Sequence, residues 1–289
     1  MPCGLYCRNE FEMSRERMVK FTLKSADDLA KMREAGKAVA AALKAMKDAA
    51  QPGVSTLDLD VLAGEILAGF GAVSALKNYQ PPFSDIKYLH NSCISINNEV
   101  LHGVPKADRI IRDGDVVKLD IAATFDGWCA DSAITTIVGT PKSPKAEKLV
   151  SVTRASLYNA IRKAIAGNTM GDVSYAIQSH VEKNGFGVVR DLVGHGIGQT
   201  PHEEGLDVPC YGRPRIGPKL VVGMTFCIEP MVTTGRGTVA HTGDDPWTII
   251  SADRTLGAHF EHTVAILEDG PLILTAAERP EEQAVTPDS

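Results

Sequence analysis

The stretch from residue 112 to 131 constrains the fold most, because it predicts one antiparallel hairpin that carries two carboxylates. Residues 116–125 are rich in β-branched side chains and follow an Asp-Gly turn signal, which is typical of a strand. A second Asp-Gly pair follows, and residues 130–138 predict the returning strand. Asp120 and Asp131 are therefore expected on adjacent strands, inside apolar sequence.

Two carboxylates in such a hairpin need a positive partner. The sequence between Leu119 and Thr140 contains no Lys or Arg that could neutralise them. A buried, unpaired carboxylate costs several kcal/mol, so pairing or metal binding is required. A divalent cation is the simplest partner.

Helix signals flank the hairpin on both sides. Ser25 with Asp28 forms a capping box, and either Ser55 or Thr56 can cap a second helix. Ser143 followed by a proline predicts the start of a third helix. Asp172 is expected to cap a fourth.

The two halves of the chain repeat a pattern. At one constant offset, three residues of the first half recur in the second, namely Gly53, Asp58 and Gly71 as Gly167, Asp172 and Gly185. The strand that carries Asp120 is echoed by a glycine turn and strand ending in Glu229, and the Asp131 strand by one starting at Glu261. Two such hairpins, related by a pseudo-twofold axis, would bring these four carboxylates together at the centre of one sheet.

A histidine between glycines completes the candidate metal site. His195 lies in Gly-His-Gly-Ile-Gly, where glycines permit tight curvature and close approach of the backbone. Four carboxylates and one imidazole suit a pair of divalent cations, with Mn²⁺, Fe²⁺, Co²⁺ and Zn²⁺ all compatible. No thiolate is expected in the set, which argues against a structural zinc site.

Composition limits the classes of partner and compartment. The net charge of −6 argues against a nucleic-acid or anionic-membrane partner. No run is long and apolar enough for a membrane span, and the first twenty residues lack the apolar segment of a signal peptide. Six widely spread cysteines do not form a disulfide framework, so a reducing cytoplasm is expected. Cys3 and Cys7 could be half of a metal site, but no partner pair lies nearby.

Four motifs together resemble type I methionine aminopeptidases of the pita-bread fold. They are the 120–131 string, the Gly-His195-Gly-Ile-Gly segment, Ile-Glu229-Pro-Met and Phe-Glu261-His-Thr. The resemblance covers about residues 25–275 and implies an α+β fold, with a pseudo-twofold antiparallel sheet and helices on its outer face.

The domain organisation expected on this basis has three parts. Residues 1–24 form an N-terminal arm, and residues 25–275 form a single catalytic domain with halves at about 25–140 and 141–275. Residues 276–289, rich in Glu and Pro, form a flexible tail.

The resemblance implies a hydrolase with two divalent cations that removes the initiator methionine from peptides and nascent proteins. Asp131 and Glu261 match the ligands that bridge the cations, Asp120 serves one cation, and His195 with Glu229 serves the other. Water shared by two cations can be deprotonated near neutral pH and attack the first peptide bond. Glu229 would take the proton and pass it to the leaving amine.

The resemblance also gives roles to two further histidines. His102 matches the histidine near the scissile amide nitrogen, and His202 matches the one that contacts the substrate carbonyl or oxyanion. His262 follows a ligand and is expected to support it. The remaining histidines are expected to be structural or exposed, namely His90, His180, His241 and His259.

Specificity requires an apolar pocket of the size of methionine. The candidates for its lining are Cys93, Phe83, Phe226 and Trp247. Here the sequence departs from the family, because residues 78–88 form a longer segment than usual. Ala75 and Asn78 also stand where a cysteine and a tyrosine are common. The shape of the pocket is therefore left open.

The partners implied are N-termini of peptides and nascent proteins, in the vicinity of the ribosome, and a monomer without membrane contact is expected. The nearest alternative is an Xaa-Pro aminopeptidase or prolidase, which shares fold and ligands but usually has a large N-terminal domain. A catalytically silent binding protein of the same fold is the alternative from another class. Such proteins usually lose ligands, whereas all five are present here.

Overall fold

The computed structural model describes residues 21–80, 85–243 and 245–277. Its four long helices form two pairs, one in each half of the chain. They are α1 (Ala26–Ala49), α2 (Thr56–Gly69), α3 (Pro144–Ile161) and α4 (Met170–Lys183).

The helix starts follow the local signals, with one correction. Ser25 and Ser55 cap α1 and α2, each in a capping box, and Ser143 caps α3. The prediction that Asp172 caps α4 is wrong, because Thr169 is the N-cap. Asp172 instead accepts hydrogen bonds from the backbone N–H and hydroxyl of Thr169, at 2.9 and 2.7 Å. The acid of the capping box sits one turn inside the helix.

In the described part of the chain the largest sheet has nine strands. Their order is β1-β4-β5-β14-β9-β7-β8, with β2 also paired to β4 and β15 to β14. Their bounds are β1 (Val73–Ser74), β2 (Cys93–Ile96), β4 (Val116–Phe125), β5 (Trp128–Ile137), β7 (Val193–Gly196), β8 (Glu203–Pro209), β9 (Thr225–Ile228), β14 (Glu261–Leu267) and β15 (Gly270–Ile273).

Two three-stranded sheets lie beside the large one. One has the order β13-β10-β6 and the other β11-β12-β3. Their bounds are β3 (Glu99–Leu101), β6 (Gly187–Val188), β10 (Met231–Thr233), β11 (Val239–His241), β12 (Ile249–Ser251) and β13 (Gly257–His259).

The centre of the large sheet is where the two halves of the chain meet. Strands β4 and β5 of the first half pair along their full length, and β5 then pairs with β14 of the second half. β14 also pairs with β9. The first hairpin is confirmed, but the second pair is not a tight hairpin, because β10 to β13 lie between β9 and β14 in sequence.

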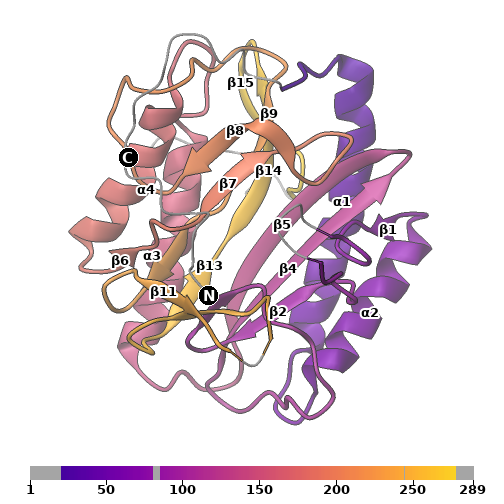
Figure 1. Cartoon of the computed structure of the whole chain (residues 1–289), viewed down its shortest axis with the longest axis vertical. Helices are drawn as coiled ribbons and strands as arrows, with labels where there is room; N and C mark the ends of the chain where they lie inside the picture. Colours follow the sequence, from indigo (N-terminus) through magenta and orange to yellow (C-terminus); the bar gives the residue numbers. More distant parts are fainter. Residues whose placement is uncertain (1–20, 81–84, 244, 278–289) are drawn as a thin grey trace.

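The helices pack against the sheets in the same two pairs. α1 contacts β4 and β5, whereas α3 contacts β10, β13 and β14. Figure 1 shows α1 and α2 on one side of the central strands and α3 and α4 on the other. Each pair encloses its own apolar cluster, one built on residues 35–138 and the other mainly on residues 149–276.

The proposed division into arm, catalytic domain and tail stays a prediction. Cys3, Cys7 and residues 278–289 lie outside the described residues. Lys24, at the end of the proposed arm, is buried, and its ammonium donates to a carboxylate oxygen of Glu203. None of the described helices has the combination of length and apolar character that crossing a membrane requires.

Candidate metal centre

Three of the predicted carboxylates share one face of the central strands. Asp120 of β4 is paired with Ala133 of β5, and Glu261 of β14 is paired with the same Ala133 from the other side. Asp131 lies two residues before Ala133 and therefore points to the same face. All three side chains are buried, so the register alone gathers carboxylates from both halves of the chain.

Glu229 and His195 join this group from the neighbouring strands. Glu229 directly follows β9, whose last residue pairs with the residue after Glu261. His195 lies on β7, and its Nε2 is 4.0 Å from Asp131 Oδ2 and 3.7 Å from Glu229 Oε1. The structure thus brings together all five residues that the sequence predicts as ligands.

The glycines around His195 are needed for this approach. A Cβ on Gly194 would lie 2.4 Å from the carbonyl oxygen of Cys227, and one on Gly198 would lie 2.5 Å from Oε1 of Glu203. Both distances are far below van der Waals contact. The expectation that the glycines allow close approach of the backbone is confirmed at Gly194, whereas the neighbour of Gly198 is a flexible side chain.

The electrostatics of the group favour a bound cation. Burial raises the pKa of Asp131 to about 7 and that of Glu229 to about 8, and the nearby Glu229 carboxylate adds to the shift at Asp131. Burial and the neighbouring carboxylates also raise the pKa values of Asp120 and Glu261 well above their usual range. Burial lowers the pKa of His195, so its imidazole is neutral and free to act as a ligand.

Two buried oxygens in the group have no hydrogen-bond partner among the described residues, namely Asp131 Oδ1 and Glu261 Oε1. A buried carboxylate oxygen is normally paired, because leaving it without a partner costs its full desolvation free energy. Oxygen atoms with one imidazole nitrogen are the donors that divalent transition metals accept. The residues present therefore fit a divalent metal centre.

Cys227 is a site residue that the sequence analysis missed. Its Sγ and single donor atoms of Asp131, His195 and Glu261 all lie within 4.8 Å of one another. Whether its sulfur joins the ligands is not tested, so the expectation that the set holds no thiolate stays a prediction. Burial, Glu261 and Asp131 raise the pKa of the Cys227 thiol. The alternation of side chains could have revealed it, since Cys227 precedes Glu229 by two positions.

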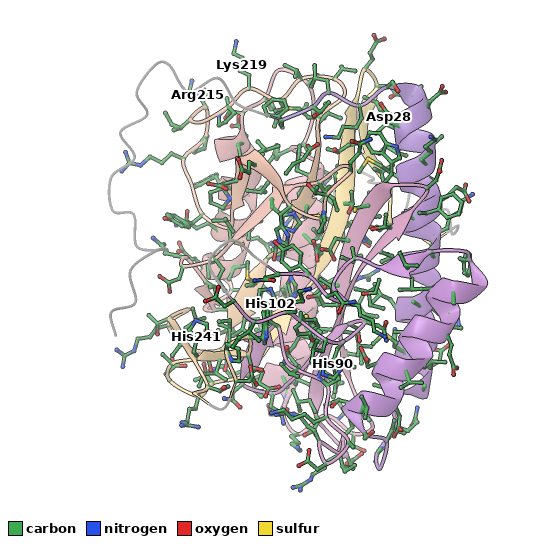
Figure 2. All side chains as sticks on the ribbon, turned by 45° about the vertical axis from the view of Figure 1, so that its right-hand side comes forward. Asp28, His90, His102, Arg215, Lys219 and His241 are labelled. Carbon is green, nitrogen blue, oxygen red and sulfur yellow. The ribbon has the colours of Figure 1, made fainter. Side chains whose placement is uncertain are left out.

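The two histidines assigned by resemblance lie beside the carboxylate group. The ring centroid of His202 is 4.0 Å from that of His195. Tyr79 stacks on the His202 ring, with ring centroids 5.4 Å apart. His102 follows β3 with a φ of 56°, and burial with nearby His259 and His202 lowers its pKa to about 3. Figure 2 shows His102 near the middle of the molecule, far from Asp28 and Arg215.

His262 and His259 differ from each other in what they contact. His262 Nδ1 is 2.8 Å from Thr275 Oγ1, and its Nε2 is 3.3 Å from the hydroxyl of Tyr158. His259 was expected to be structural or exposed, yet its Nε2 lies 3.5 Å from Oε2 of Glu229. No spacing signal marks His259, because the contact depends on the tertiary pairing of β13 with β10.

The candidate pocket residues fall into two groups. Cys93 pairs directly with Asp120 in the register of β2 and β4, so it lies beside the centre. Trp247 is half-buried and meets Tyr88 edge to face, with ring centroids 5.3 Å apart. The Tyr88 hydroxyl donates to the carbonyl oxygen of Ser92, the residue before Cys93, at 2.8 Å. Tyr88 and Tyr79 were not predicted, although both belong to the long 78–88 segment that the sequence marks as unusual.

Phe226 lies in the apolar core and not on the face of the sheet that carries the carboxylates. It is fully buried in the apolar cluster that α3 and α4 cover. It is three positions from Glu229 on nearly continuous strand, so its side chain points to the opposite face. The prediction of Phe226 in the pocket is therefore corrected to a core position, whereas Phe83 lies outside the described residues.

Comparisons of this chain with a protein-family model and with individual known proteins identify the same family. Residues 30–268 match the model of metallopeptidase family M24. Methionine aminopeptidase from Clostridium acetobutylicum is 44% identical over 256 residues, which cover 89% of this chain and 99% of that protein. Methionine aminopeptidase from Aquifex aeolicus is also 44% identical over 256 residues, covering 88% and 98%.

Solved structures show the same fold. The crystal structure of methionine aminopeptidase from Thermotoga maritima matches with a TM-score of 0.84 and 40% identity, covering 89% of this chain and 99% of that one. Prolidase from Pyrococcus furiosus matches with a TM-score of 0.66 at 20% identity, covering 89% and 66%, which supports the fold alone. The α+β pita-bread fold expected from the sequence is confirmed, and the chain belongs to metallopeptidase family M24.

Proposed function

We propose that the chain is a methionine aminopeptidase that uses two divalent cations to remove an N-terminal methionine from peptides and nascent proteins. One observation carries the proposal. Four buried carboxylates and the neutral His195 imidazole converge on one face of the sheet, and buried oxygens of Asp131 and Glu261 have no partner in the described part of the chain. Relatives that align with almost their entire length to this chain bear the name methionine aminopeptidase.

The proposed ligands divide between two cations. Asp131 and Glu261 would contact both, Asp120 would complete the coordination of one, and His195 with Glu229 would complete the other. Bound cations of this kind lower the pKa of water and polarise a carbonyl group. Mn²⁺, Fe²⁺, Co²⁺ and Zn²⁺ all suit these donors.

The chain's own residues supply the remaining steps. Glu229 would accept a proton during attack on the first peptide bond and return it to the leaving amine. His202 beside His195 would donate a hydrogen bond to the substrate carbonyl, and burial supports a neutral donor because it lowers the pKa of His202 to about 4. His102 would contact the scissile amide nitrogen.

Specificity would come from two groups of the first substrate residue, its free α-amine and its side chain. The Asp120 side of the centre would take the free α-amine, which explains action at an N-terminus. Cys93, Tyr88 and Trp247 form a contiguous wall beside Asp120 that suits an apolar side chain such as methionine. Phe83 remains a candidate for the same wall. We further propose that the enzyme acts as a monomer in the cytoplasm, near the ribosome and without nucleic-acid or membrane contact.

The proposal is tested by hydrolysis of Met-Ala-Ser and Ala-Pro-Ala peptides. The protein is purified anaerobically, stripped of metal, and titrated with Fe²⁺, Mn²⁺, Co²⁺ and Zn²⁺ in turn. Release of methionine from Met-Ala-Ser, and not of alanine from Ala-Pro-Ala, is expected with at least one cation. A preference for Ala-Pro-Ala would instead identify an Xaa-Pro aminopeptidase, and no turnover of either peptide would refute the assignment.

A further inference from the structure

The two oxygens of Glu229 face two different imidazoles. Oε1 is 3.7 Å from His195 Nε2, on the side of the proposed cations. Oε2 is 3.5 Å from Nε2 of His259, which lies on β13 and is only 1% exposed. The carboxylate is thus held between a proposed ligand and a histidine to which the proposed mechanism gives no role.

The backbone of His259 is fixed from both sides. Its carbonyl oxygen accepts a hydrogen bond of 2.6 Å from the hydroxyl of Thr135, and its N–H donates to the same hydroxyl oxygen at 2.9 Å. Its partner across the strands is Met231, two residues after Glu229. These contacts hold the main chain of His259 beside β10, so its buried side chain starts from a fixed position next to Glu229.

The ring of His259 lacks other partners. Neither Nδ1 nor Nε2 has a hydrogen-bond partner among the described residues, although both are buried. A buried imidazole in its neutral form has one donor and one acceptor, and each is costly to leave unpaired. A separation of 3.5 Å is slightly longer than a hydrogen bond, and a small rotation of the Glu229 side chain would close it.

We propose that His259 is a positioning residue for Glu229, with its Nε2–H donating to Oε2 and thereby directing Oε1 toward His195 and the metal centre. The inference rests on the proposed function of Glu229 as ligand and proton acceptor. A metal-binding side chain is commonly held in its orientation by a hydrogen bond from a residue that does not itself bind the metal. Losing that hydrogen bond costs about 10-fold to 100-fold in metal affinity or activity.

Two substitutions test whether the hydrogen bond from the Nε2 position to Glu229 matters, or whether any buried polar side chain at residue 259 is sufficient. In His259→Gln the side-chain amide nitrogen reaches the place of Nε2, whereas in His259→Asn it reaches the place of Nδ1. Both variants are polar and uncharged, and they differ by one methylene group. We expect His259→Gln to bind Co²⁺ and turn over Met-Ala-Ser close to wild type.

The His259→Asn variant should lose about 10-fold to 100-fold in Co²⁺ affinity by titration calorimetry, and a similar factor in kcat with KM little changed. Introduced into Glu229→Gln, the same substitution should cause little further loss of Co²⁺ affinity, because the carboxylate it orients is gone. Thermal unfolding of each variant checks that the fold is retained.

Equal losses in His259→Gln and His259→Asn would overturn the inference, as would wild-type Co²⁺ affinity in His259→Asn or additive losses in the double variant. These outcomes are independent of the peptide assay. If wild-type protein releases no methionine, the proposed activity fails, whereas the Co²⁺ titrations still decide the role of His259.

Discussion

Glu229 lies between the imidazoles of His195 and His259, and its position after β9 directs it to the centre of the sheet. Glu229→Gln keeps the volume and removes the proton acceptor. We expect kcat for Met-Ala-Ser to fall by about 10²-fold to 10⁴-fold, the usual contribution of a general base. The measurement is steady-state hydrolysis at saturating Co²⁺, so that any weaker metal binding does not limit the rate.

A matched control is Glu268→Gln, which makes the same change at an exposed carboxylate beyond the end of β14. Its kcat should equal that of the wild type. Full activity in Glu229→Gln, with Co²⁺ bound, would contradict the role of Glu229 as proton acceptor.

The residues of the centre differ in how far the sequence could predict them. Asp120, Asp131, Glu229 and Glu261 repeat between the halves in strands of known alternation, so spacing alone groups them. His259 contacts Glu229 only because β13 pairs with β10, a long-range contact that no local pattern encodes. Phe226 was misplaced because its neighbours in sequence are site residues, although alternation turns it toward the core.

Strand β7 reaches the centre because Gly194 lets it approach β9 closely. In Gly194→Ala the new Cβ would meet the Cys227 carbonyl oxygen at 2.4 Å, so β7 must move away and carry His195 with it. We expect a loss of about 1–3 kcal/mol in the free energy of unfolding, as for other overpacked sites. Chemical denaturation measures the loss, and Co²⁺ titration should show weaker binding.

Gly69→Ala provides the comparison, since Gly69 is the last residue of α2 and a Cβ there has no atom within 4 Å. Stability should be unchanged or slightly higher, because alanine favours the helix. If Gly194→Ala were as stable as Gly69→Ala, β7 would have room that the structure does not give it.

Among the elements, those defined by local signals were predicted best. β4 has the predicted bounds, and Ser25 caps α1 as its capping box indicates. The connection between β9 and β14 was not foreseen, because its short strands β10 to β13 form small sheets through distant pairings. The wall made by Tyr88 and Trp247 depends on the same kind of long-range contact.

At the scale of the whole molecule, the centre lies at the junction of two half-structures. Each helix pair covers its own apolar cluster, and β5 and β14 join the halves next to Ala133. Four carboxylates that repel one another therefore lie at the junction between the halves. A bound cation should stabilise the whole fold and not only the site, because ligands from both halves must be in place to bind it.

The pH dependence of this stabilisation follows from the raised pKa values. Asp131 and Glu229, with pKa values of about 7 and about 8, bind protons in the folded protein that the unfolded chain has already lost. A cation must displace these protons, so its affinity falls as pH falls through this range. We therefore expect Co²⁺ to raise the Tm of chelator-treated protein more at pH 8 than at pH 6.

The neutral imidazoles and the buried Lys118, whose pKa is lowered to about 7, also change stability with pH, but they do so with and without cation. Differential scanning calorimetry at both pH values, with and without Co²⁺, isolates the carboxylates. An equal increase in Tm at the two pH values would mean that the cation does not compete with protons at these side chains.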